Sequence, residues 1–272
     1  MKNLVVCGCS WSSRDPVYPN FEFGFLVARK LGYNYINLAR CGMSNFGIRL
    51  QIDYALKHLE PDFMIINATG VNRFEILKEL DNKYDHNKAY DQVCFGDFDW
   101  DHFDHEHHIN YGKTYDPQIW CDSIYTVISQ EARRYQEIDE DRVKALQDYA
   151  YYVFDENIKA HNDYFVLQSG LLSILESKVP FLFSPNTFEY SEFDKTGLIE
   201  DHHHIDSFNW DFIPDKYYLE NGAGEYARHN PEIVDETGNK TTHYPVSHHN
   251  SPYAHSIYAE HILDEVHKRL LF

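Results

Sequence analysis

The sequence predicts an α/β fold with a mainly parallel sheet. Short apolar runs alternate with segments whose apolar residues recur at helical spacing, giving a β-α-β-α-β order over about the first seventy residues. Three of these runs end at polar residues and glycine, which is typical of strands whose carboxyl ends open onto a ligand site. Of the 272 residues, 43% are hydrophobic, so we expect one elaborated domain spanning residues 1–272.

The first three strands are short and apolar, and a helix separates each from the next. We expect strands at residues 4–7, 35–38 and 63–67. We expect helices at residues 21–31, where Gly32 is a C-cap signal, and at 48–59, before Pro61. This order favours a parallel sheet with right-handed crossovers.

An irregular stretch then interrupts the pattern. Between about residues 80 and 125, Asp, His, Asn and aromatic residues crowd together without a period, which indicates an insertion. A long amphipathic helix is expected at residues 141–177, with interruptions near Asn162 and Gly170. A fourth strand is expected at residues 179–183, where an early proline is tolerated.

The last part of the chain has a second irregular stretch and a closing helix. Residues 184–248 form the second insertion, within which a short fifth strand is expected at 207–213. The closing helix is expected at residues 251–271, with Ser251 as N-cap and Pro252 as the first helical residue.

The charge of the chain excludes some partners. The formal net charge is −19, and the sequence contains no block of lysine and arginine. Nucleic-acid binding needs clustered basic residues that displace counterions from phosphates, and an anionic membrane surface needs them as well. We therefore expect no nucleic-acid partner and no membrane partner, and a well-solvated acidic surface.

The N-terminus and the cysteines favour a cytoplasmic protein. The first apolar run is too short for the core of a signal peptide, and no later stretch approaches the ~20 apolar residues that span a bilayer. The five cysteines are an odd set without CxxC spacing, which predicts reduced thiols rather than a disulfide framework or a zinc ribbon. They are Cys7, Cys9, Cys41, Cys94 and Cys121.

Candidate functional residues follow the first two predicted strands. Ser10 lies in a Gly-x-Ser segment directly after the first strand, although a serine there is also a common turn former or helix cap. Gly42 follows the second strand, where its N–H can point at a developing oxyanion. The alternative for Gly42 is an ordinary turn in which Ser44 or Asn45 caps the next helix.

Two further candidates complete the set. Asn72, in a Gly-x-Asn segment after the third strand, offers a side-chain amide donor at the same sheet edge, or is simply part of a turn. His249 precedes the closing helix, which suits a general base that is held by a rigid element and still reached by solvent.

In their joint order these segments resemble the four blocks of the SGNH (GDSL-like) serine esterases. The resemblance implies Ser10 as nucleophile, Gly42 as backbone oxyanion donor, Asn72 as side-chain oxyanion donor and His249 as general base. The segment 249–260 is particularly similar to the last block of the family. The resemblance also implies a three-layer α/β/α sandwich with a flavodoxin-like sheet of about five strands.

The early Gly-Cys-Ser and the acidic, aromatic-rich body are similar to bacteriophage-encoded members of that family. Such an origin places the protein in the host cytoplasm or in the virion.

Two positions depart from the family pattern. Cys9 occupies the place where the family commonly has aspartate, and Val246 stands where it usually has the triad acid. Because removing that acid costs a serine protease on the order of ten-thousand-fold in rate, another group must orient His249 in an active enzyme. Candidates are a backbone carbonyl, Asp206, Asp211 or an acid from the first insertion.

The predicted function is therefore that of a serine esterase with a Ser-His dyad or triad and a Gly/Asn oxyanion hole. Aromatic residues between 84 and 125 favour a carbohydrate substrate that carries an O-acetyl group, or are ordinary packing residues. The expected partner is a small-molecule or carbohydrate ester, and no cofactor or bound metal is expected.

Two other classes of function remain open. The segments 101–108 and 201–206 have His, Asp and Glu at close spacing, which would suit a metal-dependent hydrolase or simply solvated loops. Val246 in place of the acid is also compatible with an SGNH-like scaffold that binds ligands or has a structural role without turnover.

Overall fold

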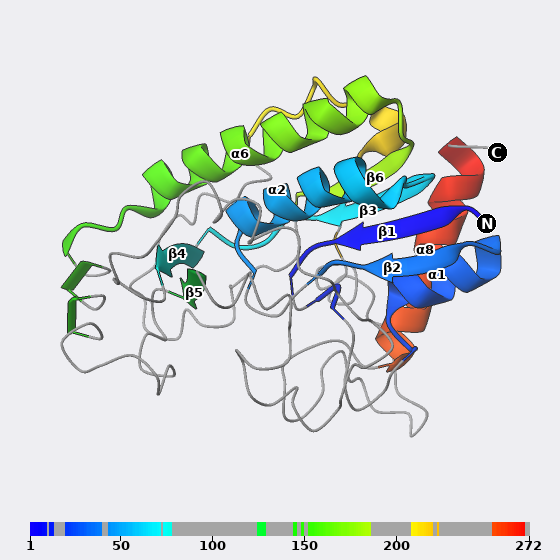
Figure 1. Cartoon of the computed structure of the whole chain (residues 1–272), viewed down its shortest axis with the longest axis horizontal. Helices are drawn as coiled ribbons and strands as arrows, with labels where there is room; N and C mark the ends of the chain where they lie inside the picture. Colours follow the sequence, from blue (N-terminus) through cyan, green and yellow to red (C-terminus); the bar gives the residue numbers. More distant parts are fainter. Residues whose placement is uncertain are drawn as a thin grey trace.

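The computed structural model describes most of the sheet and its helices (Figure 1). The described residues are 1–9, 11–13, 20–39, 43–71, 73–77, 124–128, 144–145, 148–149, 152–185, 208–219, 222 and 252–269. The strands are β1 (Asn3–Cys7), β2 (Asn34–Asn37), β3 (Phe63–Asn67), β4 (Arg73–Leu77), β5 (Ile124–Ile128) and β6 (Phe181–Ser184). The main helices are α1 (Phe23–Leu31), α2 (Asn45–Tyr54), α6 (Glu156–Ser177) and α8 (Pro252–Arg269). Two short segments are the π-helix η1 (Ala55–Leu59) and the 3-10 helix η8 (Asp215–Tyr217).

Four strands form one parallel sheet in the order β2-β1-β3-β6. This is the order of the first four strands of a flavodoxin-like sheet, and it confirms the α/β fold class. From β1 the chain moves outward to β2 and then crosses back to β3. The order therefore reverses between β1 and β3, and open α/β sheets bind ligands beyond the carboxyl ends of the strands at such a point.

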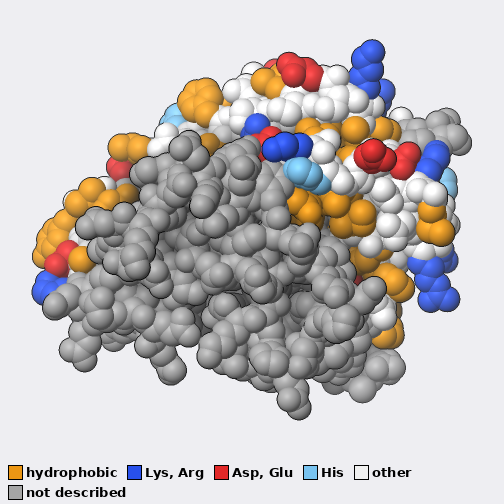
Figure 2. Space-filling view, viewed as in Figure 1, with side chains coloured by type: hydrophobic (Ala, Val, Ile, Leu, Met, Phe, Trp, Pro, Cys, Tyr) orange, Lys and Arg blue, Asp and Glu red, His pale blue; other side chains and the backbone are white. Residues whose placement is uncertain are grey.

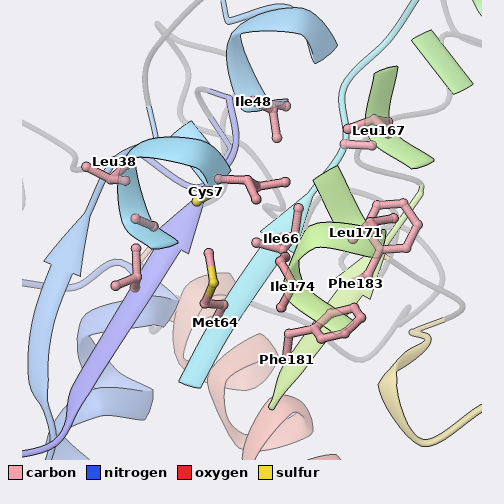
Figure 3. Packing of buried hydrophobic residues seen from close by; sticks show 14 of the residues in the cluster. Cys7, Leu38, Ile48, Met64, Ile66, Leu167, Leu171, Ile174, Phe181 and Phe183 are labelled. Atoms are coloured by element: carbon pink, nitrogen blue, oxygen red, sulfur yellow. The ribbon is translucent and has the colours of Figure 1, made fainter. Parts of the chain in front are cut away.

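Successive residues of each strand pack on opposite faces of the sheet. In β1, Val5 and Cys7 belong to the core under α2 and α6, which includes the side chains drawn in Figure 3. Leu4 and Val6 belong to the other core, under α1 and α8. All four side chains are fully buried. The three-layer α/β/α arrangement thus follows from strands that are apolar on both faces.

Capping residues determine where the helices begin and end. Gly32 ends α1 in the left-handed conformation, with φ 70°, as its position in the sequence predicts. Ser44 caps α2 by accepting a hydrogen bond from Gly47 N–H, so this helix begins at Asn45, three residues earlier than expected. Pro252 is the first residue of α8, as predicted.

The expected fifth strand at residues 207–213 is wrong where the structure describes it. Asn209 Oδ1 accepts a hydrogen bond from Asp211 N–H, and Ile213 N–H donates to Trp210 O, so residues 208–213 form turns. The aromatic side chains of Phe208 and Trp210 pack on α6 and β6. The parallel bridge to the β6 edge is made five residues later, between Tyr218 and Phe183.

The expected interruptions of the long helix are also wrong. The helix α6 runs unbroken through Asn162 and Gly170, and the interruption lies before Asp155, its N-cap. Gly170 has a packing role, because a Cβ at this position would lie 2.7 Å from Arg49 Cδ on α2. The glycine therefore allows α2 and α6 to approach closely, and does not break the helix.

The antiparallel strands β4 and β5 enclose the first predicted insertion. They pair from Arg73 with Ile128 to Leu77 with Ile124, so the chain between them leaves and returns at neighbouring points. The part of the second insertion that is described, at 208–219, is joined to the core through the buried side chains of Trp210, Ile213 and Leu219.

Figure 2 shows charged side chains of both signs interspersed over the described part of one face. Exposed apolar side chains lie on α6 and just before it, among them Tyr152, Ile158 and Phe165. In the part of the chain that is described, no helix combines the length and the apolar character needed to cross a membrane.

Candidate active site at the carboxyl edge of the sheet

The four predicted site residues Ser10, Gly42, Asn72 and His249 lie outside the described residues. The nearest described residues in the chain belong to the loops after β1, β2 and β3 and, three residues after His249, to the start of α8.

The loop after β1 is held by a glutamine of α2. Gly8 N–H donates to Gln51 Oε1 at 2.8 Å, and Gln51 Nε2 donates to Gly8 O at 3.3 Å. Ser12 N–H then donates to Cys9 O at 3.0 Å, so the chain reverses between these residues. Ser10 is one of the two residues between them. A side chain at position 8 would disturb this turn, because its Cβ would lie 2.8 Å from Ser12 Oγ.

Ser12 joins the β1 loop to the ends of the two neighbouring strands. Its carbonyl oxygen accepts from Asn37 Nδ2 at 2.9 Å, and its hydroxyl oxygen accepts from Asn67 Nδ2 at 2.8 Å. Asn37 is the last residue of β2 and Asn67 the last residue of β3. All three residues are buried, where hydrogen bonds that are shielded from water hold the chain rigidly.

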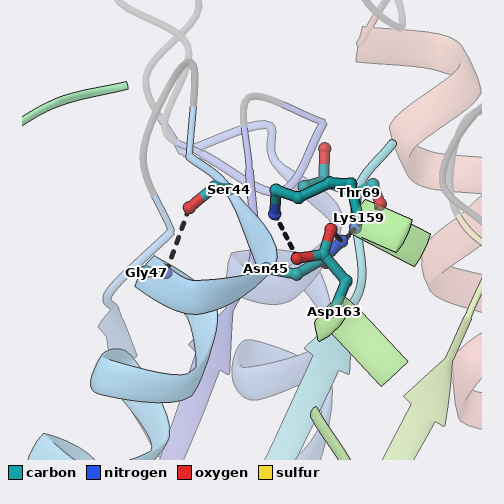
Figure 4. A network of polar contacts seen from close by, with 6 residues as sticks. All are labelled: Ser44, Asn45, Gly47, Thr69, Lys159 and Asp163. Atoms are coloured by element: carbon teal, nitrogen blue, oxygen red, sulfur yellow. Dashed lines mark hydrogen bonds and ion pairs between the residues drawn. The ribbon is translucent and has the colours of Figure 1, made fainter. Parts of the chain in front are cut away.

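A second buried network joins the loops after β2 and β3 (Figure 4). Asn45, the first residue of α2, accepts from Thr69 N–H at 2.8 Å and donates to Thr69 O at 2.9 Å. Its second amide hydrogen goes to Asp163 Oδ2 of α6 at 2.9 Å. Every hydrogen-bonding group of the Asn45 side chain is therefore used, which leaves only one orientation of its amide.

Asp163 is the buried acid of this network. Only 2% of its side chain is exposed, and it forms an ion pair with Lys159, one helical turn earlier. Burial raises the pKa of the Asp163 carboxyl, and the opposing effects of Lys159 and Asn45 are smaller. The carboxylate is satisfied by an ammonium and an amide, as a buried charge requires.

The start of α8 lies beside the start of α1. Phe23 N–H donates to His255 Nδ1 at 3.4 Å, and the ring of Phe23 meets the ring of Tyr258 edge-on at 4.9 Å. The helix α1 begins on the side of the sheet where β1 ends, because it connects β1 to the parallel strand β2. The first turn of α8 therefore lies at the carboxyl edge of the sheet, and His249 precedes Pro252 by three residues in the sequence.

The departures from the family pattern have partial structural explanations. Cys9 is fully buried in the same core as Trp11 and Met43, so the middle residue of Gly-Cys-Ser is a packing residue here. Asp211, one candidate for the triad acid, lies on an exposed turn. Asp206 and Val246 lie outside the described residues.

The candidate metal ligands at 101–108 and 201–206 lie outside the described residues as well. Among the residues that the structure does describe, no group of three His, Cys, Asp or Glu side chains lies close enough to hold a metal.

A cavity of about 440 Å³ opens along α1 and the edge strand β2. Its lining includes Glu22, Arg29, Tyr35 and Asn37. Apart from Asn37 it contains none of the residues that hold the loops after β1 and β3, so we do not assign it to the ester site.

Several residues of this edge were not singled out in the sequence. Gln51, Asn67 and Asp163 carry no motif of their own, and their partners are 43, 55 and 118 positions away in the chain. The available signal was the occurrence of asparagine as the last residue of two apolar strands, where a polar side chain is unusual. The i, i+4 spacing of Lys159 and Asp163 is typical of an ordinary ion pair on the surface of a helix.

No protein-family model matches the chain, and a search of curated proteins finds no relative. Among solved structures, a psychrotrophic esterase from Pseudoalteromonas sp. is similar with a TM-score of 0.48 and 10% identity, covering 99% of both chains. An acetyl xylan esterase from the rumen bacterium Butyrivibrio proteoclasticus has a TM-score of 0.38 and 12% identity, covering 99% of this chain and 64% of the other. A GDSL-like lipase from Bacteroides thetaiotaomicron has a TM-score of 0.30 and 11% identity, covering 98% and 88%. With identities and TM-scores this low, the function has to be argued from the residues of the chain itself.

Proposed function

We propose that the protein is a serine esterase whose site lies at the carboxyl edge of the sheet. Ser10 is the nucleophile and His249 the general base. The N–H groups of Ser10 and Gly42 and the side-chain amide of Asn72 bind the oxyanion.

One observation carries the proposal: the loops after β1, β2 and β3 are tied to one another by buried hydrogen bonds. Ser12 connects the β1 loop to the ends of both neighbouring strands, and Asn45 connects the β2 loop to the β3 loop through Thr69. These loops contain Ser10, Gly42 and Asn72, the first three residues of the SGNH pattern. Loops fixed in this way suit a preorganised site, because rigid donors need no reorganisation during the reaction.

The position of α8 supports the assignment of His249. This histidine precedes Pro252 by three residues, and a stretch of three residues spans at most about 11 Å. Because α8 begins beside α1, at the edge where the β1 loop lies, this length of chain supports His249 as the general base of that edge.

The proposed reaction is acyl transfer in two steps. His249 removes the hydroxyl proton of Ser10 as the oxygen attacks the ester carbonyl carbon, and it then returns the proton to the departing alcohol. Water, activated by the same imidazole, releases the acid from the acyl-enzyme. Each oxyanion donor stabilises the transition state by roughly 3 to 4 kcal/mol.

For the substrate we propose a small acyl ester, such as an O-acetyl group on a carbohydrate. The net charge of −19 favours a neutral substrate over an anionic one. The aromatic residues at 84–125 that would stack on sugar rings lie outside the described residues.

Hydrolysis of p-nitrophenyl acetate tests the proposal. The wild type releases p-nitrophenolate, and Ser10→Ala and His249→Ala each lower kcat by at least about a thousand-fold without unfolding the protein. Circular dichroism of the same samples confirms that they are folded. Full activity in folded Ser10→Ala contradicts the proposal.

A second function, binding without turnover, is favoured by Val246 at the position of the usual triad acid. It predicts no hydrolysis by the folded wild type and unchanged ligand affinity in Ser10→Ala.

A further inference from the structure

We propose that Asn45, held by Asp163 and Lys159 of α6, is a positioning residue that fixes the loop after β2 against the loop after β3, and with them the two oxyanion donors. The inference rests on the proposed function, because it concerns the donors Gly42 and Asn72. It adds three residues to which the four-block pattern gives no role.

The contact between Asn45 and Thr69 lies close to both oxyanion donors in the chain. Gly42 is three residues before Asn45, and Asn72 is three residues after Thr69. Each donor is thus at most about 11 Å from the Asn45–Thr69 contact along the chain. The Asn45 side chain binds both backbone groups of Thr69, as a neighbouring strand would. Its oxygen accepts from Thr69 N–H, and its nitrogen donates to Thr69 O. It therefore joins the two loops where parallel strands alone would leave them unpaired.

The residues that orient Asn45 are largely buried. Its second amide hydrogen is bound by Asp163 Oδ2. Asp163 is 2% exposed and Lys159 13% exposed, so both charges have been moved out of water. A buried ion pair is weak evidence for stability, because the cost of desolvation offsets the attraction between the charges. The ion pair still restricts the geometry, because Asp163 accepts the second amide hydrogen of Asn45. The amide then has one orientation in which all of its hydrogen bonds are made.

Another polar contact between the same helices lies away from the site loops. Arg49 Nε of α2 donates to Ser169 Oγ of α6 at 2.8 Å, and this contact is exposed. It joins α2 to α6 without touching either loop. Ser169 therefore provides a matched control, since its removal weakens the packing of the two helices and leaves the site loops in place.

The experiment compares Asn45→Ala with Ser169→Ala in p-nitrophenyl acetate hydrolysis. A displacement of about 1 Å in an oxyanion donor costs about 100-fold in rate. We therefore expect kcat and kcat/KM of Asn45→Ala to fall together by about 100-fold, because the lost interaction exists only in the transition state. Ser169→Ala keeps wild-type kcat. Equal kcat in folded Asn45→Ala and Ser169→Ala overturns the positioning role.

A charge exchange tests whether Asp163 acts through Asn45. Asn45→Asp alone places two carboxylates side by side and lowers kcat by at least about 100-fold. In the double variant Asn45→Asp/Asp163→Asn, the new aspartate accepts from Thr69 N–H and from the new asparagine but cannot donate to Thr69 O, so kcat recovers in part, by about tenfold over Asn45→Asp. No recovery in the folded double variant contradicts the coupling. If Asn45→Ala does not fold, Asp163→Ala decides, because it removes the acceptor that orients the Asn45 amide: a kcat equal to wild type in the folded variant overturns the proposal, and a loss of about tenfold supports it.

Failure of this inference is distinguishable from failure of the proposed function. A wild type that neither hydrolyses the ester nor reacts with a fluorophosphonate probe removes the esterase proposal and the inference with it. An active wild type with unaffected Asn45→Ala removes the positioning role alone.

Discussion

The two helical layers of the sheet stabilise the protein by different kinds of contact. In the layer of α1 and α8 the main contacts are apolar and aromatic, such as the edge-on pair of Phe23 and Tyr258. The layer of α2 and α6 adds directional contacts, through the half-buried Gln51 to the β1 loop and through the buried Asn45 to the β3 loop. Apolar packing tolerates small shifts, whereas buried hydrogen bonds do not. The layer of α2 and α6 is therefore the one that positions the site.

The largest expected effect is a core substitution in the layer of α1 and α8. Ile262 is fully buried in α8. Ile262→Ala removes packing and leaves a cavity, so we expect the free energy of unfolding to fall by about 2 to 5 kcal/mol, and by about 0.5 to 1.5 kcal/mol for Ile262→Val. Urea unfolding measures both losses. The kcat of the folded fraction stays at the wild-type value; a tenfold loss in folded Ile262→Val would show that this layer also controls the site.

A pair of cap substitutions separates stability from positioning. Ser44→Ala removes the N-cap of α2 and Gly32→Ala forces a side chain into the left-handed region at the end of α1. Each lowers the free energy of unfolding by about 1 to 2 kcal/mol. Only Ser44→Ala is expected to lower kcat, because Ser44 follows Gly42 by two residues and begins the helix that carries Asn45. Parallel thermal melts and kcat measurements test this pair, and equal kcat losses would contradict the division between the layers.

The smallest expected effects are opposite pH dependences of the two layers. Burial raises the pKa of Asp163 above its ordinary value of 3.8, so its contribution to stability is lost as pH rises from about that value through the raised pKa. Burial is also the main reason that the pKa of His261 on α8 is below 6.5. The positive charges of Lys268 and Arg269 lower this pKa further, and the negative charges of Glu265 and Asp264 oppose the shift. The contribution of His261 is therefore lost as pH falls from about 6.5.

The measurement is the stability difference between the wild type and each neutral variant across pH. Relative to Asp163→Asn, the wild type loses stability on raising the pH above 3.8. Relative to His261→Gln, it loses stability on lowering the pH below 6.5. If the stability difference changes with pH in the same direction in both comparisons, burial is not the dominant cause of the pKa shift in one of the two groups.

The sheet was predictable because its information is local. The apolar runs at 4–7 and 63–67 agree with β1 and β3 to within a residue, since a strand buried on both faces is continuously apolar. The fifth strand was wrong for a reason that is only partly local. Aromatic residues alternate at 208–212, but the turn chemistry of Asn209 and the packing on α6 overrule that period.

The candidate site was predictable only as an order of motifs. Ser10 and Gly42 follow strands in the sequence, so their edge of the sheet follows from topology. The residues that hold their loops do not, because Asn45 and Asp163 are 118 positions apart and meet only when α6 packs on α2. Long-range polar pairs of this kind have no periodicity that a single sequence reveals.

The most direct test of Ser10 as the nucleophile is covalent labelling with a fluorophosphonate probe, followed by mass spectrometry of the digested protein. The expected result is one stoichiometric adduct on the peptide that contains Ser10, formed much more slowly in His249→Ala and absent in Ser10→Ala. An adduct on another residue, or hydrolysis of p-nitrophenyl acetate by protein whose Ser10 stays unlabelled, would contradict the assignment.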